Sequence, residues 1–108
     1  MNAPLIPDPD SPVRGLIQAI AICESEGLVP DDPEYGPWLS PDRTYGVGIA
    51  RIGDTFCGAG VHVVRDWEAE RSDELCQINP PCPASLFRTA IRAAAAIVAR
   101  EREEGRRG

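Results

Sequence analysis

The chain has 108 residues, of which 43% are hydrophobic and 26% charged, and its formal net charge is −6. From this length and composition we expect neither a second domain nor wholesale disorder. No stretch approaches the roughly 20 apolar residues that a membrane-spanning helix needs. The first residues lack the basic group and the apolar run of a secretory signal. We therefore expect one cytoplasmic domain over residues 1–108, with flexible ends at 1–10 and 104–108.

The negative charge is concentrated in the N-terminal part of the chain. Residues 1–42 contain eight acidic residues against Arg14 alone, whereas the remaining 66 residues contain ten arginines and nine acids. An uneven distribution of this kind steers association with partners of opposite charge. The N-terminal part is therefore predicted to attract a basic surface.

The first predicted element is a helix over residues 12–26. Ser11 is a suitable N-cap, and proline at position 12 suits the first helical turn. Apolar residues then recur at helical spacing, and Gly27 is placed to end the helix in the left-handed conformation.

Residues 29–42 have a different character. Four prolines alternate with four acidic residues and with Tyr35 and Trp38. Prolines at this density cannot supply the N–H donors of a helix or a sheet, so this segment is predicted to be a long structured loop. Loops of this length in small domains are often functional.

Two strand-like runs, 44–52 and 55–64, flank Gly53-Asp54, a dipeptide typical of a two-residue hairpin turn. With that turn, the residue numbers of the two members of each cross-strand pair sum to 107. This pairing predicts a face of small residues and an opposite face of larger ones: Gly46, Gly48, Ala50, Ile52, Cys57, Ala59, Val61 and Val63 against Tyr45, Val47, Ile49, Phe56, Gly58, Gly60, His62 and Val64. Both faces are largely apolar, so we expect both to be covered by helices, loops or a partner.

The segment after the hairpin is less regular. Residues 66–76 fit a short helix anchored by Trp67 and Leu75 or an irregular crossing, and a run of prolines follows. The last helix is predicted over residues 84–103, because a broad apolar stripe and four consecutive alanines favour it. The predicted fold class is α+β: a helix, a β-hairpin, a connection and a long C-terminal helix packed on the sheet.

Four side chains could in principle bind a metal: Cys57, His62, Cys76 and Cys82. Structural zinc sites usually have pairs of ligands two to four residues apart, and no such pair is present. Cys57 and His62 are five positions apart on one predicted strand, so they should point to opposite faces. We expect no metal and no cofactor. In a secreted protein, Cys76 and Cys82 would be the first disulfide to test.

Nucleic-acid binding is the next interpretation to weigh. The order of a helix, a β-ribbon and an alanine-rich helix resembles that of double-stranded RNA-binding domains. Six arginines also lie on the last helix and tail: Arg88, Arg92, Arg100, Arg102, Arg106 and Arg107. However, acidic residues are mixed with them and the net charge is negative, which opposes binding to phosphates. A nucleic-acid partner is therefore not expected.

The leading hypothesis is a non-enzymatic protein-binding module, such as a small acidic inhibitor, an immunity protein or a phage anti-defence protein. Its predicted partner-binding residues are Asp31, Asp32, Glu34, Tyr35, Trp38 and Asp42. Aromatic anchors on a stiff loop lose little entropy on binding. Trp38 could instead fold over the hairpin. The alternatives are an enzyme or ligand-binding domain that uses cysteine and histidine in a pocket, and a homodimer joined through its sheet.

Overall fold

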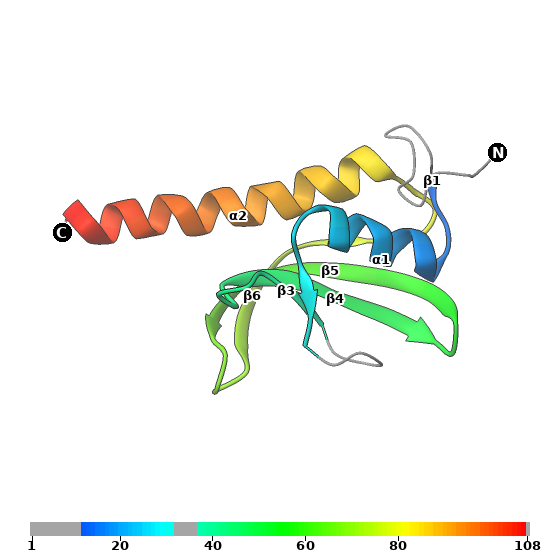
Figure 1. Cartoon of the computed structure of the whole chain (residues 1–108), viewed down its shortest axis with the longest axis horizontal. Helices are drawn as coiled ribbons and strands as arrows, with labels where there is room; N and C mark the ends of the chain where they lie inside the picture. Colours follow the sequence, from blue (N-terminus) through cyan, green and yellow to red (C-terminus); the bar gives the residue numbers. More distant parts are fainter. Residues whose placement is uncertain (1–11, 32–36, 108) are drawn as a thin grey trace.

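The computed structural model of the chain describes residues 12–31 and 37–107. Both helices lie on one face of an antiparallel sheet, which gives two layers (Figure 1). In chain order the elements are β1 (Pro12–Val13), α1 (Leu16–Ser25), β2 (Val29–Pro30), β3 (Trp38–Leu39), β4 (Tyr45–Ile52), β5 (Thr55–Asp66), β6 (Arg71–Ile78), β7 (Cys82–Pro83) and α2 (Ala84–Arg107). The predicted α+β class, with a long C-terminal helix packed on the sheet, is confirmed.

The main sheet has five strands in the order β2-β3-β4-β5-β6, and every neighbouring pair is antiparallel. A second ladder of two residues pairs β1 with β7. This short ladder joins the segment before α1 to the segment before α2, so both helices begin at the same end of the molecule (Figure 1). None of the described helices combines the length and the apolar character needed to cross a lipid bilayer.

The hairpin between β4 and β5 turns at Gly53-Asp54, as predicted, but its register changes after two pairs. Near the turn the paired numbers sum to 107, and from Ala50 onward they sum to 108. Cys57 is the extra residue of a β-bulge there, and Gly58 follows with φ of 150°, which glycine adopts readily. A shift of one residue moves every later side chain to the other face. The predicted face assignment is therefore wrong beyond the bulge.

The corrected register gathers the large apolar side chains on the face that the helices cover. There, Val47 and Val61 are direct partners and both are fully buried. The apolar stripe of α2 packs on this face because its residues recur at spacings of three and four. The buried core comprises, from the main sheet, Val47, Phe56, Ala59, Val61, Val63 and Ile78, from the helices, Leu16, Ala19, Ile22, Cys23, Ala84, Phe87, Ile91, Ala94 and Val98, and from β1, β7 and the segment after α1, Val13, Cys82 and Leu28.

Strands lie in two segments for which none was predicted: 29–42, predicted as a long structured loop, and 66–76, predicted as a short helix or an irregular crossing. Within 29–42, β2 and β3 pair with each other and extend the sheet beyond β4, with Pro30 on the edge strand where its missing N–H is tolerated. Within 66–76, a turn leads into β6, which pairs with β5. Most residues of β6 are exposed and polar, so the strand has no alternating pattern by which to predict it.

Both helices differ from their predicted bounds. The first helix begins at Leu16 rather than at residue 12, and its N-cap is Gly15 instead of the predicted Ser11. The side chain of Gln18 accepts hydrogen bonds from the backbone N–H groups of Arg14 and Gly15, at 2.7 and 3.1 Å, and so caps this end. The helix is followed by Gly27 with φ of 82°, as predicted. The last helix runs four residues past its predicted end.

Candidate functional site

The sheet face opposite the helices carries small residues and two adjoining hollows. The larger hollow has a volume of about 690 Å³ and the smaller one about 270 Å³. Gly48 and His62 line both of them. The two hollows therefore form one continuous depression along β4 and β5, which we call the trough. No described helix lies on this face of the sheet, whereas both helices lie on the other.

Glycine residues form the floor of the trough. A Cβ added at Gly48 would meet no atom within 4 Å, so the space above this residue is open. A Cβ at Gly60 would lie 2.8 Å from Nε2 of His62, because the imidazole lies across this glycine. The floor therefore has no side chain above Gly48, and one imidazole lies at the junction of the two hollows.

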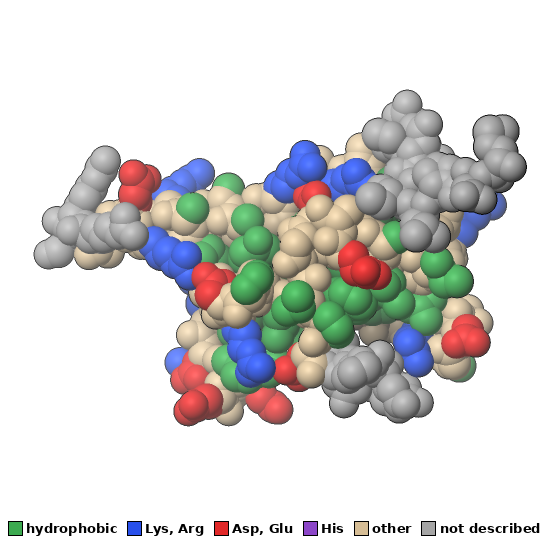
Figure 2. All heavy atoms as spheres, viewed as in Figure 1, with side chains coloured by type: hydrophobic (Ala, Val, Ile, Leu, Met, Phe, Trp, Pro, Cys, Tyr) green, Lys and Arg blue, Asp and Glu red, His purple; other side chains and the backbone are tan. Residues whose placement is uncertain are grey.

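The walls of the larger hollow come from opposite edges of the sheet. The β2–β3 region and the connection between β5 and β6 both extend away from the helices (Figure 1). The first wall contributes Asp31, Pro37 and Leu39, and the second contributes Asp66, Trp67, Glu68, Glu70, Arg71 and Ser72. Four carboxylates thus lie around an apolar interior, against a single lining arginine. Figure 2 shows acidic side chains gathered at the β5–β6 end of the molecule.

The guanidinium group of Arg43, which does not itself line the larger hollow, contacts one residue of each wall. The guanidinium carbon of Arg43 lies 4.9 Å from the centre of the Trp67 ring. Its Nη2 lies 3.6 Å from Oδ1 of Asp31. Both partners line the hollow. The aromatic ring and the carboxylate therefore hold this cation.

The smaller hollow brings together two side chains that the sequence placed on opposite faces. Cys57 and His62 both line it, because the bulge at Cys57 changes the alternation along β5. The thiol of Cys57 donates to the carbonyl of Thr55 at 3.6 Å, and Nδ1 of His62 lies 3.4 Å from the hydroxyl of Ser72. These hydrogen bonds do not join the cysteine to the histidine.

The other cysteines are free thiols held in the protonated form. Burial raises the pKa of Cys23 to about 12, and it also raises the pKa of Cys76 and Cys82. A protonated thiol is a poor nucleophile and a poor metal ligand. Within residues 12–31 and 37–107, no group of three or more histidine, cysteine or acidic side chains converges on a point where it could hold a metal ion.

The predicted partner-binding residues lie in different environments. Asp31 is at the rim of the larger hollow. Trp38 is half-buried in β3, where it pairs with Val47 and packs against the core, so it is part of the sheet rather than folded over the open face of the hairpin. Asp42 belongs to a polar network at the β3–β4 turn. The remaining three, Asp32, Glu34 and Tyr35, lie outside the described residues. The aromatic wall of the trough is Trp67, which the sequence analysis did not select.

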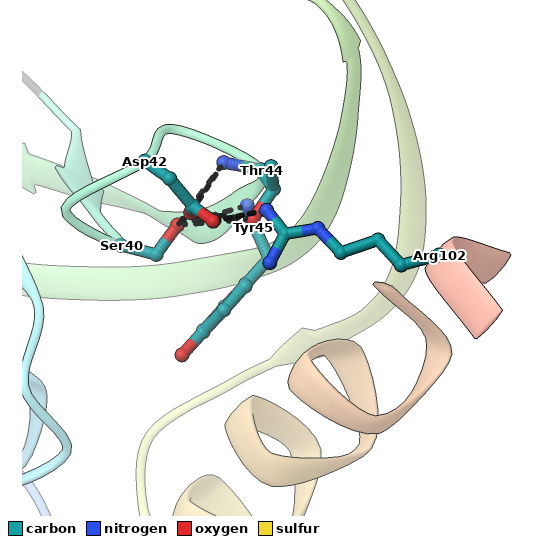
Figure 3. A network of polar contacts seen from close by, with 5 residues as sticks. All are labelled: Ser40, Asp42, Thr44, Tyr45 and Arg102. Atoms are coloured by element: carbon teal, nitrogen blue, oxygen red, sulfur yellow. Dashed lines mark hydrogen bonds and ion pairs between the residues drawn. The ribbon is translucent and has the colours of Figure 1, made fainter. Parts of the chain in front are cut away.

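The network around Asp42 ties the β3–β4 turn to the last helix (Figure 3). The Asp42 carboxylate accepts hydrogen bonds from the hydroxyls of Thr44 at 2.7 Å and Ser40 at 2.8 Å, and it forms an ion pair with Arg102. These hydrogen bonds hold the pKa of Asp42 well below its usual range, and the largest effects come from Thr44 and Arg102, with a smaller one from Ser40. The charge of Asp42 is thus already paired within the domain.

The fold pairs three acidic residues of the N-terminal part with arginines from the rest of the chain. Besides Asp42, Glu26 pairs with Arg92 of α2 at 2.6 Å, and Asp31 pairs with Arg43. By contrast, Glu68 and Glu70 take part in none of the ion pairs found among the described residues. A local surplus of negative charge therefore lies at the trough, beside the connection between β5 and β6.

The Asp42 network predicts a specific dependence of stability on pH. Replacing Asp42 with asparagine should lower the free energy of unfolding by about 1 kcal/mol at pH 7, because solvent screens a pair this exposed. The pKa is depressed in the folded state, so the contribution is complete above the unfolded pKa of about 3.9 and is lost as the pH falls below it. Urea unfolding of both proteins from pH 7 to pH 2.5 measures this.

A variant of the partner arginine provides the control. In the background of Arg102→Gln, the Asp42→Asn change should cost less, because one of the donors is already missing. A difference between parent and Asp42→Asn that stays constant down to pH 2.5 would contradict the role given to this carboxylate.

Comparisons with protein-family models, with curated proteins and with solved structures find no significant match to this chain. The function is therefore argued from the geometry of the trough alone.

Proposed function

We propose that the chain is a non-enzymatic protein-binding module that holds a basic segment of its partner in the trough. The observation that carries this proposal is the larger hollow, whose apolar interior is lined by four carboxylates. Two of them are paired with Arg43 and Arg71, whereas Glu68 and Glu70 belong to none of the ion pairs found among the described residues. Arginine and lysine side chains have an apolar stem, which fits the apolar interior of such a hollow, and a cationic head, which fits its carboxylates. A basic partner was the expectation from the sequence, and the proposal relocates its binding site from the 31–42 segment to the trough.

The open space above Gly48 in the trough floor favours an extended partner segment. Side chains of that segment could approach Gly48 closely, because no Cβ occupies the space above it. The acidic rim would add electrostatic steering, which raises the association rate and disfavours acidic partners. A protein of this type would act as an inhibitor or immunity protein by covering a basic surface. Its four free cysteines fit the reducing cytoplasm that the sequence favours.

Binding of a synthetic basic peptide tests this proposal. The capped octapeptide (Arg-Ala)4 should bind and the matched (Glu-Ala)4 should not, with an association rate that falls as salt rises. Replacing Glu68 and Glu70 together with glutamine should weaken binding by about tenfold, mainly through the association rate. Surface plasmon resonance at two salt concentrations gives both rates.

The matched control removes the same charge from another surface. Glu103 and Glu104 are exposed near the end of α2 and do not line the trough. Their double replacement with glutamine should change affinity by less than about twofold. Equal losses from the two pairs would mean that the peptide responds only to net charge, and the proposal would then be wrong.

A second candidate function is an enzyme or ligand-binding domain that uses Cys57 and His62. The observation in its favour is that both side chains line the smaller hollow. Under this alternative, replacing Glu68 and Glu70 would leave catalysis or ligand binding intact, whereas Cys57→Ser or His62→Ala would abolish it. Under our proposal, Cys57→Ser retains peptide binding.

A further inference from the structure

We propose that Arg43 occupies a guanidinium-binding subsite at one end of the trough, and that an arginine of the partner replaces it there. This inference rests on the proposed function, and it specifies the chemistry of the group that is bound. It also assigns Arg43 the role of an intramolecular competitor.

The contacts of Arg43 define the subsite. Its guanidinium lies over Trp67 of one wall and beside Asp31 of the other, at 4.9 Å from the ring centre and 3.6 Å from the carboxylate oxygen. An aromatic face with a carboxylate beside it is a common environment for a bound guanidinium. Because the chain places its own arginine there, this end of the trough is already shaped to receive one.

The side chain of Arg43 is held weakly enough to be displaced. It is 52% exposed, and its ion pair with Asp31 is a single contact of 3.6 Å rather than a bidentate one. Exposed pairs of this kind contribute little to stability. Its backbone, in contrast, is fixed, because Arg43 has φ of 59° and its N–H donates to the carbonyl of Ser40 at 2.9 Å. The side chain can therefore leave the subsite while the turn stays in place.

The acidic rim favours exchange with an incoming cation. Glu68 and Glu70 follow Trp67 in the same wall and belong to no ion pair among the described residues. A partner arginine in the subsite would meet these carboxylates as well as Asp31. Arginine fits better than lysine, because a planar guanidinium can stack on the indole and pair with a carboxylate at the same time.

Because Arg43 competes for the subsite, a partner must gain contacts beyond those of a single cation in order to bind. A single cation on a passing surface gains little by replacing Arg43, since one guanidinium is exchanged for another. A segment that also fills the rest of the trough gains those additional contacts. Competition by Arg43 would thus select extended arginine-containing segments over isolated positive charges.

The test compares (Arg-Ala)4 with (Lys-Ala)4 on the parent protein, Arg43→Gln and Arg71→Gln. Arg43→Gln should bind the arginine peptide about three- to tenfold more tightly, because the subsite is then empty. The gain should be smaller for the lysine peptide. Arg71 lines the same hollow and is paired with Asp66 at 3.9 Å, so Arg71→Gln removes the same charge without emptying the subsite. Thermal melting verifies that each variant is folded.

Three outcomes would overturn the inference while leaving the proposed function intact. These are unchanged or weaker binding of the arginine peptide by Arg43→Gln, equal gains in the two arginine variants, and equal gains for the two peptides. If neither peptide binds any of the folded proteins, the proposed function fails and the subsite fails with it.

Discussion

Replacing Val61 with aspartate is expected to abolish cooperative folding. Val61 is fully buried, and its direct strand partners are Val47 on β4 and Cys76 on β6. Its side chain points into the layer between the sheet and the helices, where an added carboxylate would lose its hydration without a paired cation. A cost of at least about 4 kcal/mol is expected for such a change. This is a large part of the roughly 5–15 kcal/mol that stabilises a small domain.

Circular dichroism during urea unfolding measures this effect. The matched control is Thr55→Asp, which adds the same charge at an exposed position of the same strand and should leave the transition nearly unchanged. If Val61→Asp unfolds cooperatively near the midpoint of the parent, the register of β4, β5 and β6 described above is wrong.

The elements that the sequence predicted well are those in which one periodic face is buried locally. The apolar stripe of α2 recurs every three or four residues because only one side of the helix meets the sheet. The turn at Gly53-Asp54 was predictable because few dipeptides adopt its backbone conformation, and Gly53 has φ of 58°. Both features depend on neighbouring residues and not on distant contacts.

The bulge at Cys57 could not be predicted from periodicity. A single extra residue on β5 leaves the alternation of apolar residues intact on each side and changes only how the two runs are joined. As a result, Val47 was assigned to the wrong face, and Cys57 and His62 were separated although they line one hollow. The adjacent Gly58, with its positive φ, is the one local signal that could have indicated the bulge.

The trough could not be predicted from the sequence either, because the residues of its two walls are far apart in the chain. Asp31 and Trp67 lie on opposite sides of the larger hollow and are brought together only by the pairing of five strands. The charge pattern predicted an acidic surface near residues 31–42. Pairing of Asp42 with Arg102 removed part of that surface, which could not be foreseen without the position of α2.

Filling the trough from its floor is expected to abolish binding of the basic peptide. Gly48 lines both hollows, and a Cβ there would meet no atom within 4 Å. Phenylalanine also suits a β-strand, so Gly48→Phe should fold. Its ring would occupy the space that we assign to the partner. We expect the affinity for (Arg-Ala)4 to fall at least about 30-fold, which corresponds to about 2 kcal/mol of binding free energy.

The most direct measurement is therefore the dissociation constant of (Arg-Ala)4 for the parent, Gly48→Phe and Thr55→Phe, each checked by thermal melting. Thr55→Phe adds the same ring at an exposed position of β5 that does not line the trough. If the trough is the binding site, Thr55→Phe will bind the peptide like the parent, and Gly48→Phe, although folded, will not bind it measurably. Folded Gly48→Phe that binds the peptide with the affinity of the parent would show that the partner site lies elsewhere on the molecule.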